Sequence, residues 1–452
     1  MIFRVRATRD TFITDAQKRR VKMTGSNFGA AETLDVYKRL GVSGAIGVAG
    51  SSSLARSLLY FDVDQFAALT ASGVAPTTGA RFWLRMRGAT TADTLPSSFT
   101  LDVVPMSRSW DEGRGFDVNG FNDRGVCNWD KATSTIWWTT AGGDFLTTTT
   151  ASLAFDTGLE NIDVEVTPMV NAWLTGGLVN NGLMVKLTGS QETDANDYFI
   201  KRFYGRTSRF QHRRPFIEAR WDDSARDDRG LFRYDQTGSL FLHNTVGGRL
   251  TDLPVGSGTL RLAVWHASGV VTWATASRVS QGIYSASFAV PSSSLYSGSV
   301  LFDRWGSASY AYMTGAFHPS VEERTPTLGA GNLIAKVRNL RNEYTQADVP
   351  RLLVFVRDRD NYRLDTVLTS SMTIPSIVKR AFYRVVDDDT GEEVVPFGTG
   401  SVESTRMSYN ASGSFFNFRM SALEAATYRF QLLVDMDGED IVVDAGPRFR
   451  VV

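Results

Sequence analysis

The chain is poor in the residue types on which most protein chemistry depends. Of its 452 residues only one is a cysteine, Cys127, and only four are histidines. A single cysteine excludes an internal disulfide framework and a multi-cysteine metal site. No histidine lies near Cys127 in the sequence, so we expect a small buried hydrophobe. None of the histidines has a metal-like partner three or four residues along the chain, which argues against histidine catalysis: His212, His243, His266 and His318.

Motifs for catalysis and cofactor binding are missing too. The sequence has no G-x-S-x-G elbow, no P-loop, no H-E-x-x-H and no dinucleotide-binding fingerprint. The glycine-rich stretch 41–50 indicates a loop. Acidic clusters at 222–228 and 194–197 offer oxygen ligands, but neither has the spacing of an EF-hand calcium loop, and solvated linker charge explains them better. The sequence therefore predicts no catalytic residue, no cofactor and no metal site.

Charge and hydropathy restrict the partners. The formal net charge is zero, whereas a general nucleic-acid binder needs a basic surplus. No run approaches the roughly 18 apolar residues that a membrane span requires. The first residues, MIFRVRATRDTFITD, alternate like a strand and lack the apolar stretch of a signal peptide. We expect a protein made in a cytoplasm without a cleaved signal, which binds neither nucleic acid nor membrane.

Lysine is also scarce. Eight of the 48 basic residues are lysines, which leaves 40 arginines. A GC-rich genome explains this bias. A protein that assembles through its surface explains it equally well, because arginine is enriched at interfaces.

What the sequence has in abundance is alternation with a period of two residues. Hydrophobic residues make up 42% of the chain, and half-buried strands are indicated at 81–87, 259–266 and 351–358. Clusters of Ser, Thr, Gly and Asn separate such runs, as in sandwiches and jelly rolls. We predict an all-β fold, with a jelly-roll-like β-sandwich domain followed by two smaller immunoglobulin-like β-sandwich domains: residues 1–222, 230–329 and 333–452.

Local signals place linkers, one turn and one helix within this scheme. The polar stretch 222–230 and the Pro/Gly segment 325–332 are predicted linkers, and residues 388–391 the turn of a hairpin. In TPMVNAWLTGG, Thr167 is placed to cap a short helix that starts at Pro168 and stops at Gly176. We expect the following residues to form the structural core of the first domain: Phe61, Asp163, Trp173 and Phe216.

Two groups of side chains are candidates for function. Four tryptophans lie in one short stretch, where they can stack on sugar rings, contact a partner or, as tryptophans in sandwiches usually do, fill the core: Trp110, Trp129, Trp137 and Trp138. Asp111 and Glu112 form the one suggestive local carboxylate pair for a polysaccharide-degrading enzyme. Adjacent strand residues point to opposite faces, which makes this pair poor for the task.

The first domain resembles the DNRLRE family of β-sandwich modules, which are related to some carbohydrate-binding modules. The resemblance covers nearly half of the chain and implies the fold; some relatives bind polysaccharide and many are only structural. The long loop 42–55 departs from the compact pattern of the family. The segments that carry the resemblance are DTFITDAQ (10–17), NFGAAETLDVYKR (27–39), SLLYFDVDQF (57–66), RFWLRMRGA (81–89), SWDEG (109–113), residues 163–186 and residues 202–221.

The third domain resembles a domain found in structural proteins of marine tailed phages. The matching segments are NLRNEYTQADVPRLLVFVRDRDNY (339–362) and residues 394–434. This resemblance covers about a quarter of the chain and implies a virion component, not an activity.

Together these observations predict a non-catalytic structural component of a tailed-phage virion, attached at the neck, collar or tail or as capsid decoration. Its expected partners are other virion proteins, and we expect a homo-oligomer or multiple symmetric copies. A glycan-binding adhesin, free or on the particle, is the alternative, and it would use the aromatic residues of the first domain. A polysaccharide-degrading enzyme is the third hypothesis.

Overall fold

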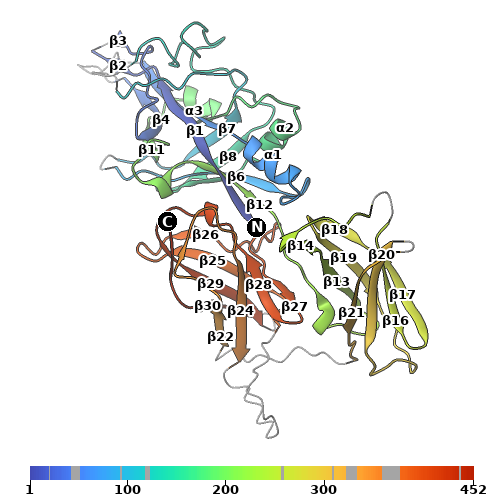
Figure 1. The fold of residues 1–452 in the computed structure, drawn as a ribbon. Helices are drawn as coiled ribbons and strands as arrows, with labels where there is room; N and C mark the ends of the chain where they lie inside the picture. Colours follow the sequence, from blue (N-terminus) through green and yellow to red (C-terminus); the bar gives the residue numbers. More distant parts are fainter. Residues whose placement is uncertain are drawn as a thin grey trace. The chain divides into compact units, whose positions relative to one another are not determined.

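The computed structural model describes residues 1–19, 21–41, 51–91, 94–117, 123–255, 259–307, 310–321, 333–358, 377–436 and 439–452. Strands make up 46% of the described residues and helices 8%, and strands dominate the ribbon in Figure 1. The prediction of an all-β fold of several sandwich domains is therefore confirmed. The glycine-rich stretch 42–50 and the predicted linker 325–332 lie outside the described residues.

The chain forms two compact units. The first, called here the N-terminal unit, comprises Phe3–Ala68 and Arg81–Ala219, and the second comprises Met1–Ile2, Leu69–Ala80 and Arg220–Val452. Within the second unit two separate hydrophobic cores form, one from residues 232–317 and one that includes residues 335–451. The second unit therefore contains two sandwiches, named below the middle and the C-terminal sandwich.

The N-terminal unit is built on a ten-stranded sheet in the order β8-β7-β10-β5-β1-β12-β6-β9, with β4 and β11 off this path. The central pair, β1 and β5, is antiparallel, and its residues Leu58, Leu59 and Ile13 are fully buried. The elements up to residue 220 are β1 (Ile2–Thr14), β2 (Gln17–Lys18), β3 (Val21–Lys22), β4 (Thr33–Leu40), β5 (Ser52–Phe61), α1 (Asp64–Ala71), β6 (Arg81–Met86), β7 (Phe99–Pro105), β8 (Ala151–Phe155), β9 (Ile162–Glu165), α2 (Thr167–Leu174), β10 (Leu183–Leu187), α3 (Gly189–Thr193), β11 (Tyr198–Tyr204), the 3-10 turn η1 (Gln211–Arg213) and β12 (Phe216–Arg220).

Three of the four predicted core residues lie in the interior: Phe61, Trp173 and Phe216. The fourth, Asp163, is exposed, so its prediction was wrong. The reason is the alternation of β9, where Ile162 and Val164 point into the core and Asp163 points outward. Its carboxylate lies 3.6 Å from the guanidinium of Arg85 on the neighbouring strand β6.

Helix α2 forms where the sequence predicts a helix, with a different start. Thr167 is its first residue and Val166 its N-cap, without a side-chain cap. The Thr167 hydroxyl instead accepts a hydrogen bond from the backbone N–H of Phe82 at 2.9 Å, which ties the helix to β6. Gly176 follows the helix with φ +74°, a conformation that favours glycine. The prediction that Thr167 caps the helix was therefore wrong.

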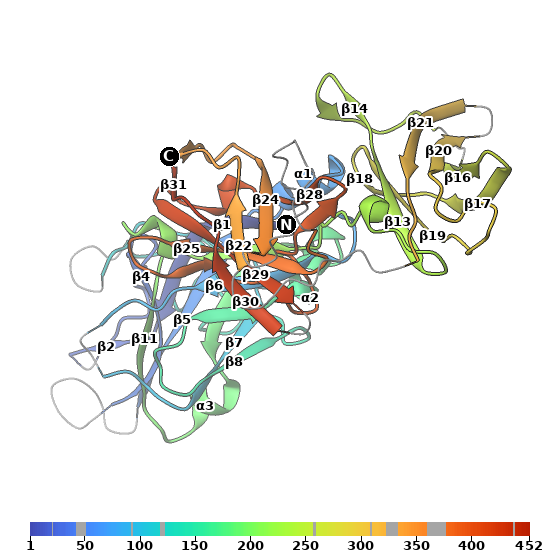
Figure 2. The ribbon, with the colours of Figure 1, turned by 90° about the horizontal axis from the view of Figure 1, so that it is seen from below.

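The middle sandwich encloses its core between two sheets (Figures 1 and 2). One sheet has the order β13-β19-β18 and the other β17-β16-β20-β21. Core residues such as Leu262, Val264 and Trp305 are fully buried between them. The elements are η2 (Asp228–Gly230), β13 (Thr237–His243), β14 (Thr245–Val246), β15 (Arg249–Leu250), β16 (Arg261–His266), β17 (Gly269–Thr275), β18 (Ser277–Ser280), β19 (Ile283–Ala289), β20 (Leu301–Ser307) and β21 (Tyr310–Phe317).

The C-terminal sandwich pairs a four-stranded sheet, β22-β24-β28-β27, with a six-stranded sheet, β23-β31-β29-β25-β26 plus β30 on β29. The predicted hairpin at 388–391 is present between β25 and β26, where the Asp387 carboxylate accepts from the N–H groups of Asp389 and Thr390. The elements are β22 (Leu333–Val337), β23 (Glu343–Tyr344), β24 (Arg351–Asp358), β25 (Ala381–Asp387), β26 (Glu393–Val395), β27 (Ser408–Asn410), β28 (Gly413–Asn417), η3 (Met420–Ala422), β29 (Thr427–Met436), β30 (Glu439–Asp444) and β31 (Phe449–Val451).

The polar stretch 222–230, called here the connector, is ordered and not a solvated linker as predicted. Its backbone bonds to β27, since the N–H of Asp227 donates to the Tyr409 carbonyl and the Tyr409 N–H to the Ala225 carbonyl, both at 3.0 Å. The Asp228 carboxylate accepts from the Tyr409 hydroxyl and from the N–H of Ser239 on β13, both at 2.8 Å. The connector is therefore hydrogen-bonded to both sandwiches.

A buried ion pair fixes the end of the connector to the middle sandwich. Arg229 binds Asp303 of β20 through two hydrogen bonds of 2.6 and 3.0 Å, and Asp303 is fully buried. Trp305 donates its indole N–H to the same carboxylate at 2.8 Å. Gly315, opposite Asp303 on β21, leaves the space for the guanidinium, because a Cβ there would lie 2.6 Å from Nη1 of Arg229.

Trp173→Ala is expected to lower the free energy of unfolding by about 3–5 kcal/mol, because it truncates the largest of the three buried side chains of α2 and leaves a cavity. Trp173→Phe should cost less, since the indole N–H of Trp173 has no hydrogen-bond partner among the described residues. Trp137, which is 61% exposed, supplies the control, and its truncation should change stability by less than about 0.5 kcal/mol. Denaturant titration measures all three, and an unchanged transition in Trp173→Ala would contradict the expectation.

Arg229→Leu is expected to destabilise the protein by about 3–5 kcal/mol, because it leaves the Asp303 carboxylate buried and uncompensated. The matched control is Arg278→Leu. Arg278 binds Asp252 in an exposed pair at 3.0 Å, and such pairs contribute about 0–1 kcal/mol. Calorimetric melting distinguishes the two variants; equal losses would show that the Asp303 pair is no stronger than an exposed one.

Candidate functional site

Three of the four tryptophans proposed as contact residues are buried. Trp110, Trp129 and Trp138 pack around Cys127, itself buried as predicted, in one hydrophobic cluster of the N-terminal unit. The Trp110 indole donates to the carbonyl of Asn181 at 3.0 Å and the Trp138 indole to that of Asn128 at 2.8 Å. Their role is core packing, so they are not contact residues for a glycan or a partner. Trp137 alone remains exposed, with the Lys131 ammonium 4.9 Å from its ring centre.

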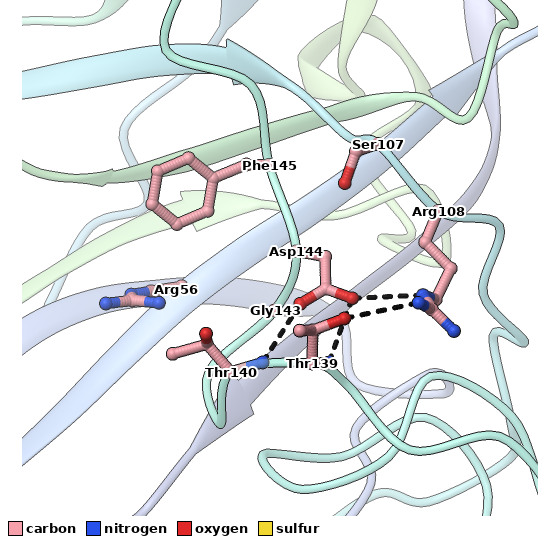
Figure 3. A pocket seen from close by; sticks show the side chains of 8 residues that line it. All are labelled: Arg56, Ser107, Arg108, Thr139, Thr140, Gly143, Asp144 and Phe145. Atoms are coloured by element: carbon pink, nitrogen blue, oxygen red, sulfur yellow. Dashed lines mark hydrogen bonds and ion pairs between the residues drawn. The ribbon is translucent and has the colours of Figure 1, made fainter.

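A pocket of about 430 Å³ lies beside this cluster (Figure 3). Its two guanidiniums already have carboxylate partners: Arg56 binds Glu192 through two hydrogen bonds, and Arg108 lies 3.0 Å from Asp144. Figure 3 shows Asp144 also accepting from the N–H groups of Thr139 and Thr140. Because the charges are paired within the protein, little remains to recognise a ligand.

Glu112 does have a carboxylate neighbour, but it is Asp10 and not the exposed Asp111. One oxygen of Glu112 accepts from the backbone N–H of Asp10 at 2.8 Å and from the Arg206 guanidinium at 2.7 Å. Asp10 in turn accepts from the backbone N–H of Arg206. Asp10 is buried, and its other oxygen has no hydrogen-bond partner in the described part of the chain. The predicted Asp111–Glu112 pair is therefore replaced by a cluster of the buried Asp10 with the partly exposed Glu112 and Arg206.

Burial raises the pKa of Asp10 to about 7. The hydrogen bond from the backbone of Arg206 lowers the pKa of Asp10, and the nearby charge of Glu112 raises it further. A carboxyl group that holds its proton near neutral pH is a feature of many acid–base sites, and equally of structural clusters. Asp10 does not line the pocket of Figure 3, and its contacts with Glu112 and Arg206 join residues far apart in the sequence of the N-terminal unit.

A group of exposed aromatic side chains lies on the outer face of the sheet β17-β16-β20-β21. A groove of about 600 Å³ runs over this face, and we call it the aromatic groove. Trp273 is 62% exposed and Tyr310 65%, and both lie on one face, where a contiguous exposed apolar patch can mark a binding site. The groove is lined by Val255, Thr259, Arg261, Ala263, Trp265, Trp273, Arg304, Gly306, Ser307 and Tyr310.

Strand register explains how the groove forms. Leu262 and Val264 of β16 point into the core, so Arg261, Ala263 and Trp265 point outward. Ala263 is paired with Trp273 on one side and with Arg304 on the other. Two strand spacings, about 10 Å, therefore separate the backbones of Trp273 and Arg304, with the small residue Ala263 between them. Gly306, which is paired with Arg261, has no side chain to fill the groove.

The groove was not identified from the sequence, although one signal was present. The alternation of TLRLAVWH places Arg261, Ala263 and Trp265 on one face, but it does not tell which face is buried. Pairing with Trp273 and Arg304 depends on sheet order, which no local pattern gives. Among the described residues no group of three His, Cys, Asp or Glu side chains is arranged to hold a metal ion. No helix in the same ranges is long and apolar enough to cross a membrane.

Comparison with known proteins identifies no family. The chain matches no family model and no curated protein. A Salmonella alpha-2-macroglobulin reacted with methylamine aligns with 97% of this chain and 28% of its own, at 10% identity and a TM-score of 0.17. A DUF4785 family protein from Legionella pneumophila aligns with 98% of this chain and 92% of its own, at 8% identity and a TM-score of 0.15. The tetra-tandem repeat in the extending region of a large adhesion protein aligns with 97% of this chain and 98% of its own, at 11% identity and a TM-score of 0.16. The chain thus spans little more than a quarter of the alpha-2-macroglobulin, and TM-scores this low support no inference about function.

The raised pKa of Asp10 predicts a pH dependence of stability. Between about pH 4 and pH 7 the folded state keeps a proton on Asp10 that the unfolded state has lost. The contribution of this group to the free energy of unfolding therefore falls with rising pH, by about 1 kcal/mol per pH unit in that window. Asp10→Asn should remove this slope, so its stability relative to the unaltered protein should rise from pH 4 to pH 7. Asp111→Asn, an exposed neighbour of Glu112, should leave the slope unchanged in urea titrations at each pH.

Proposed function

We propose that the chain is a non-catalytic structural component of a tailed-phage particle, attached at the neck, collar or tail or as capsid decoration. The proposal rests first on the resemblance of residues 339–362 and 394–434 to structural proteins of marine tailed phages. The resemblance of the N-terminal part to DNRLRE modules fits this role, since many such modules are structural.

The observation that carries the proposal is the ordered connector. In the second unit the chain passes between two sandwiches through residues that bond to both, with Asp228 contributing one oxygen to each. The Arg229–Asp303 pair adds a further contact. If the connector moved away from the middle sandwich, the buried carboxylate of Asp303 would be left without its partner, which is strongly unfavourable. A scaffold that must keep its modules in fixed succession needs such a connector, whereas a tether between independent binding modules does not.

The expected partners are other virion proteins, and the chain acts as a homo-oligomer or in multiple symmetric copies. The zero net charge gives little repulsion between copies, which suits dense packing. Arginine and aromatic side chains carry interface energy more often than others, and the chain has 40 of the former and 12% of the latter.

The test is the particle itself. Mass spectrometry of purified virions should detect the chain, and image reconstruction should place it at symmetry-related positions outside the shell or along the tail. Virions made without it should differ from complete ones in mass and outline. If both preparations have the same mass, protein profile and outline, the chain is not a virion component.

A free glycan-binding adhesin is the second candidate. Three of the four tryptophans that it was expected to use are buried in the N-terminal unit. A polysaccharide-degrading enzyme is the third. Glu112 is held by Arg206 and by the backbone of Asp10, which fits a structural role. We expect no release of reducing sugar from a polysaccharide panel; release that is abolished by Glu112→Gln would overturn the non-catalytic assignment.

A further inference from the structure

The outer face of the sheet β17-β16-β20-β21 carries positive charge without a partner. These four strands contain one acidic residue, Asp303, and it points into the core, where Arg229 holds it. Arg261 and Arg304 are exposed on the opposite face, and neither has an ion pair with any residue that the structure describes. A ligand for this face therefore has to bring the negative charge.

The same face holds indole rings on a rigid support. Trp273 and Trp265 stand on paired strands, and the register shift at Val264 and Trp265 leaves Val271 of β17 as the extra residue of a bulge. Ala263, which lies between Trp273 and Arg304, has a small side chain. A flat or ring-shaped group can therefore contact both the indole of Trp273 and the guanidinium of Arg304. Strand residues lose little further freedom on binding, so such a site is already formed before the ligand arrives.

We propose that the aromatic groove binds an acidic polysaccharide, one that contains uronic acid units. Arginine presents a planar fork of donors that matches a carboxylate in bidentate fashion. The negative faces of the indoles suit the C–H groups on the flat side of a sugar ring. Thr259 and Ser307 at the groove wall add hydroxyls that can hydrogen-bond to those of the sugar.

The size and charge of the groove favour a polysaccharide over two other anionic partners. Its volume of about 600 Å³ lies in the range of small-ligand sites, whereas a stable protein interface covers about 800 Å² on each partner. Two arginines on a chain with zero net charge fall short of the basic surplus that a nucleic-acid strand requires. The proposal concerns this surface alone and does not depend on where the protein is located.

The experiment is calorimetric titration of the full chain with an oligogalacturonate and, separately, with a neutral oligosaccharide of the same length. The oligogalacturonate should bind at least tenfold more tightly, and its affinity should fall as salt is raised, because exposed ion pairs are screened. Trp273→Ala and Arg304→Gln should each weaken binding at least tenfold. The controls are Trp137→Ala, since Trp137 is 61% exposed in the other unit, and Arg249→Gln, an exposed arginine of the same sandwich outside the groove.

Three outcomes would overturn the proposal. The first is no binding of the oligogalacturonate, or equal binding of the neutral oligosaccharide. The second is an affinity that falls as much in Trp137→Ala or Arg249→Gln as in the groove variants. The third is tighter binding of a thymidine oligonucleotide or of a poly-glutamate peptide, which would assign the face to a nucleic acid or to an acidic protein segment. Because all groove substitutions are on exposed side chains, unchanged melting temperatures show that any loss of binding is not a loss of fold.

Discussion

The larger sheets of this protein each bury one face in a core, and the two-residue period of the strand then decides which residues the other face presents. β20 shows the rule most clearly. Leu301, Asp303 and Trp305 point into the core of the middle sandwich, and Phe302 and Arg304 point out. The aromatic groove is a consequence of this constraint, because the strand register that buries Leu262, Val264 and Trp305 also places the outward residues of β16, β17 and β20 side by side.

The same constraint explains why a polar stretch became part of the structure. Asp303 lies on the inner face of β20, where an unpaired carboxylate would be strongly destabilising. Arg229 of the connector supplies the compensating charge, and Gly315 leaves the room for it. The burial of one carboxylate therefore fixes the path of the chain between two sandwiches, and the neighbouring Asp228 and Tyr409 complete the attachment.

Local patterns in the sequence were sufficient for the fold class, for the hairpin at 388–391 and for a helix near Trp173, because turns, strand alternation and helix ends are set by neighbouring residues. Local patterns do not predict contacts between residues that are far apart in the sequence. Glu112 meets Asp10 across 102 residues, and Trp110 and Trp138 are buried by loop packing that leaves no periodic signal. The prediction for Asp163 was wrong although its alternation with Ile162 and Val164 is visible in the sequence, because a strand that packs one face against the core turns every second residue outward.

Placing a binding face and a structural core on opposite sides of one strand separates their physical requirements. Substitutions on the outer face of β16 or β20 change charge and shape in the groove, while Leu262, Val264 and Trp305 continue to hold the sheets together. Substitutions on the inner face act on stability and reach the groove only by disturbing the strand. A scaffold built this way can vary its ligand without refolding its core, which reconciles a structural role for the whole chain with recognition by one of its sheets.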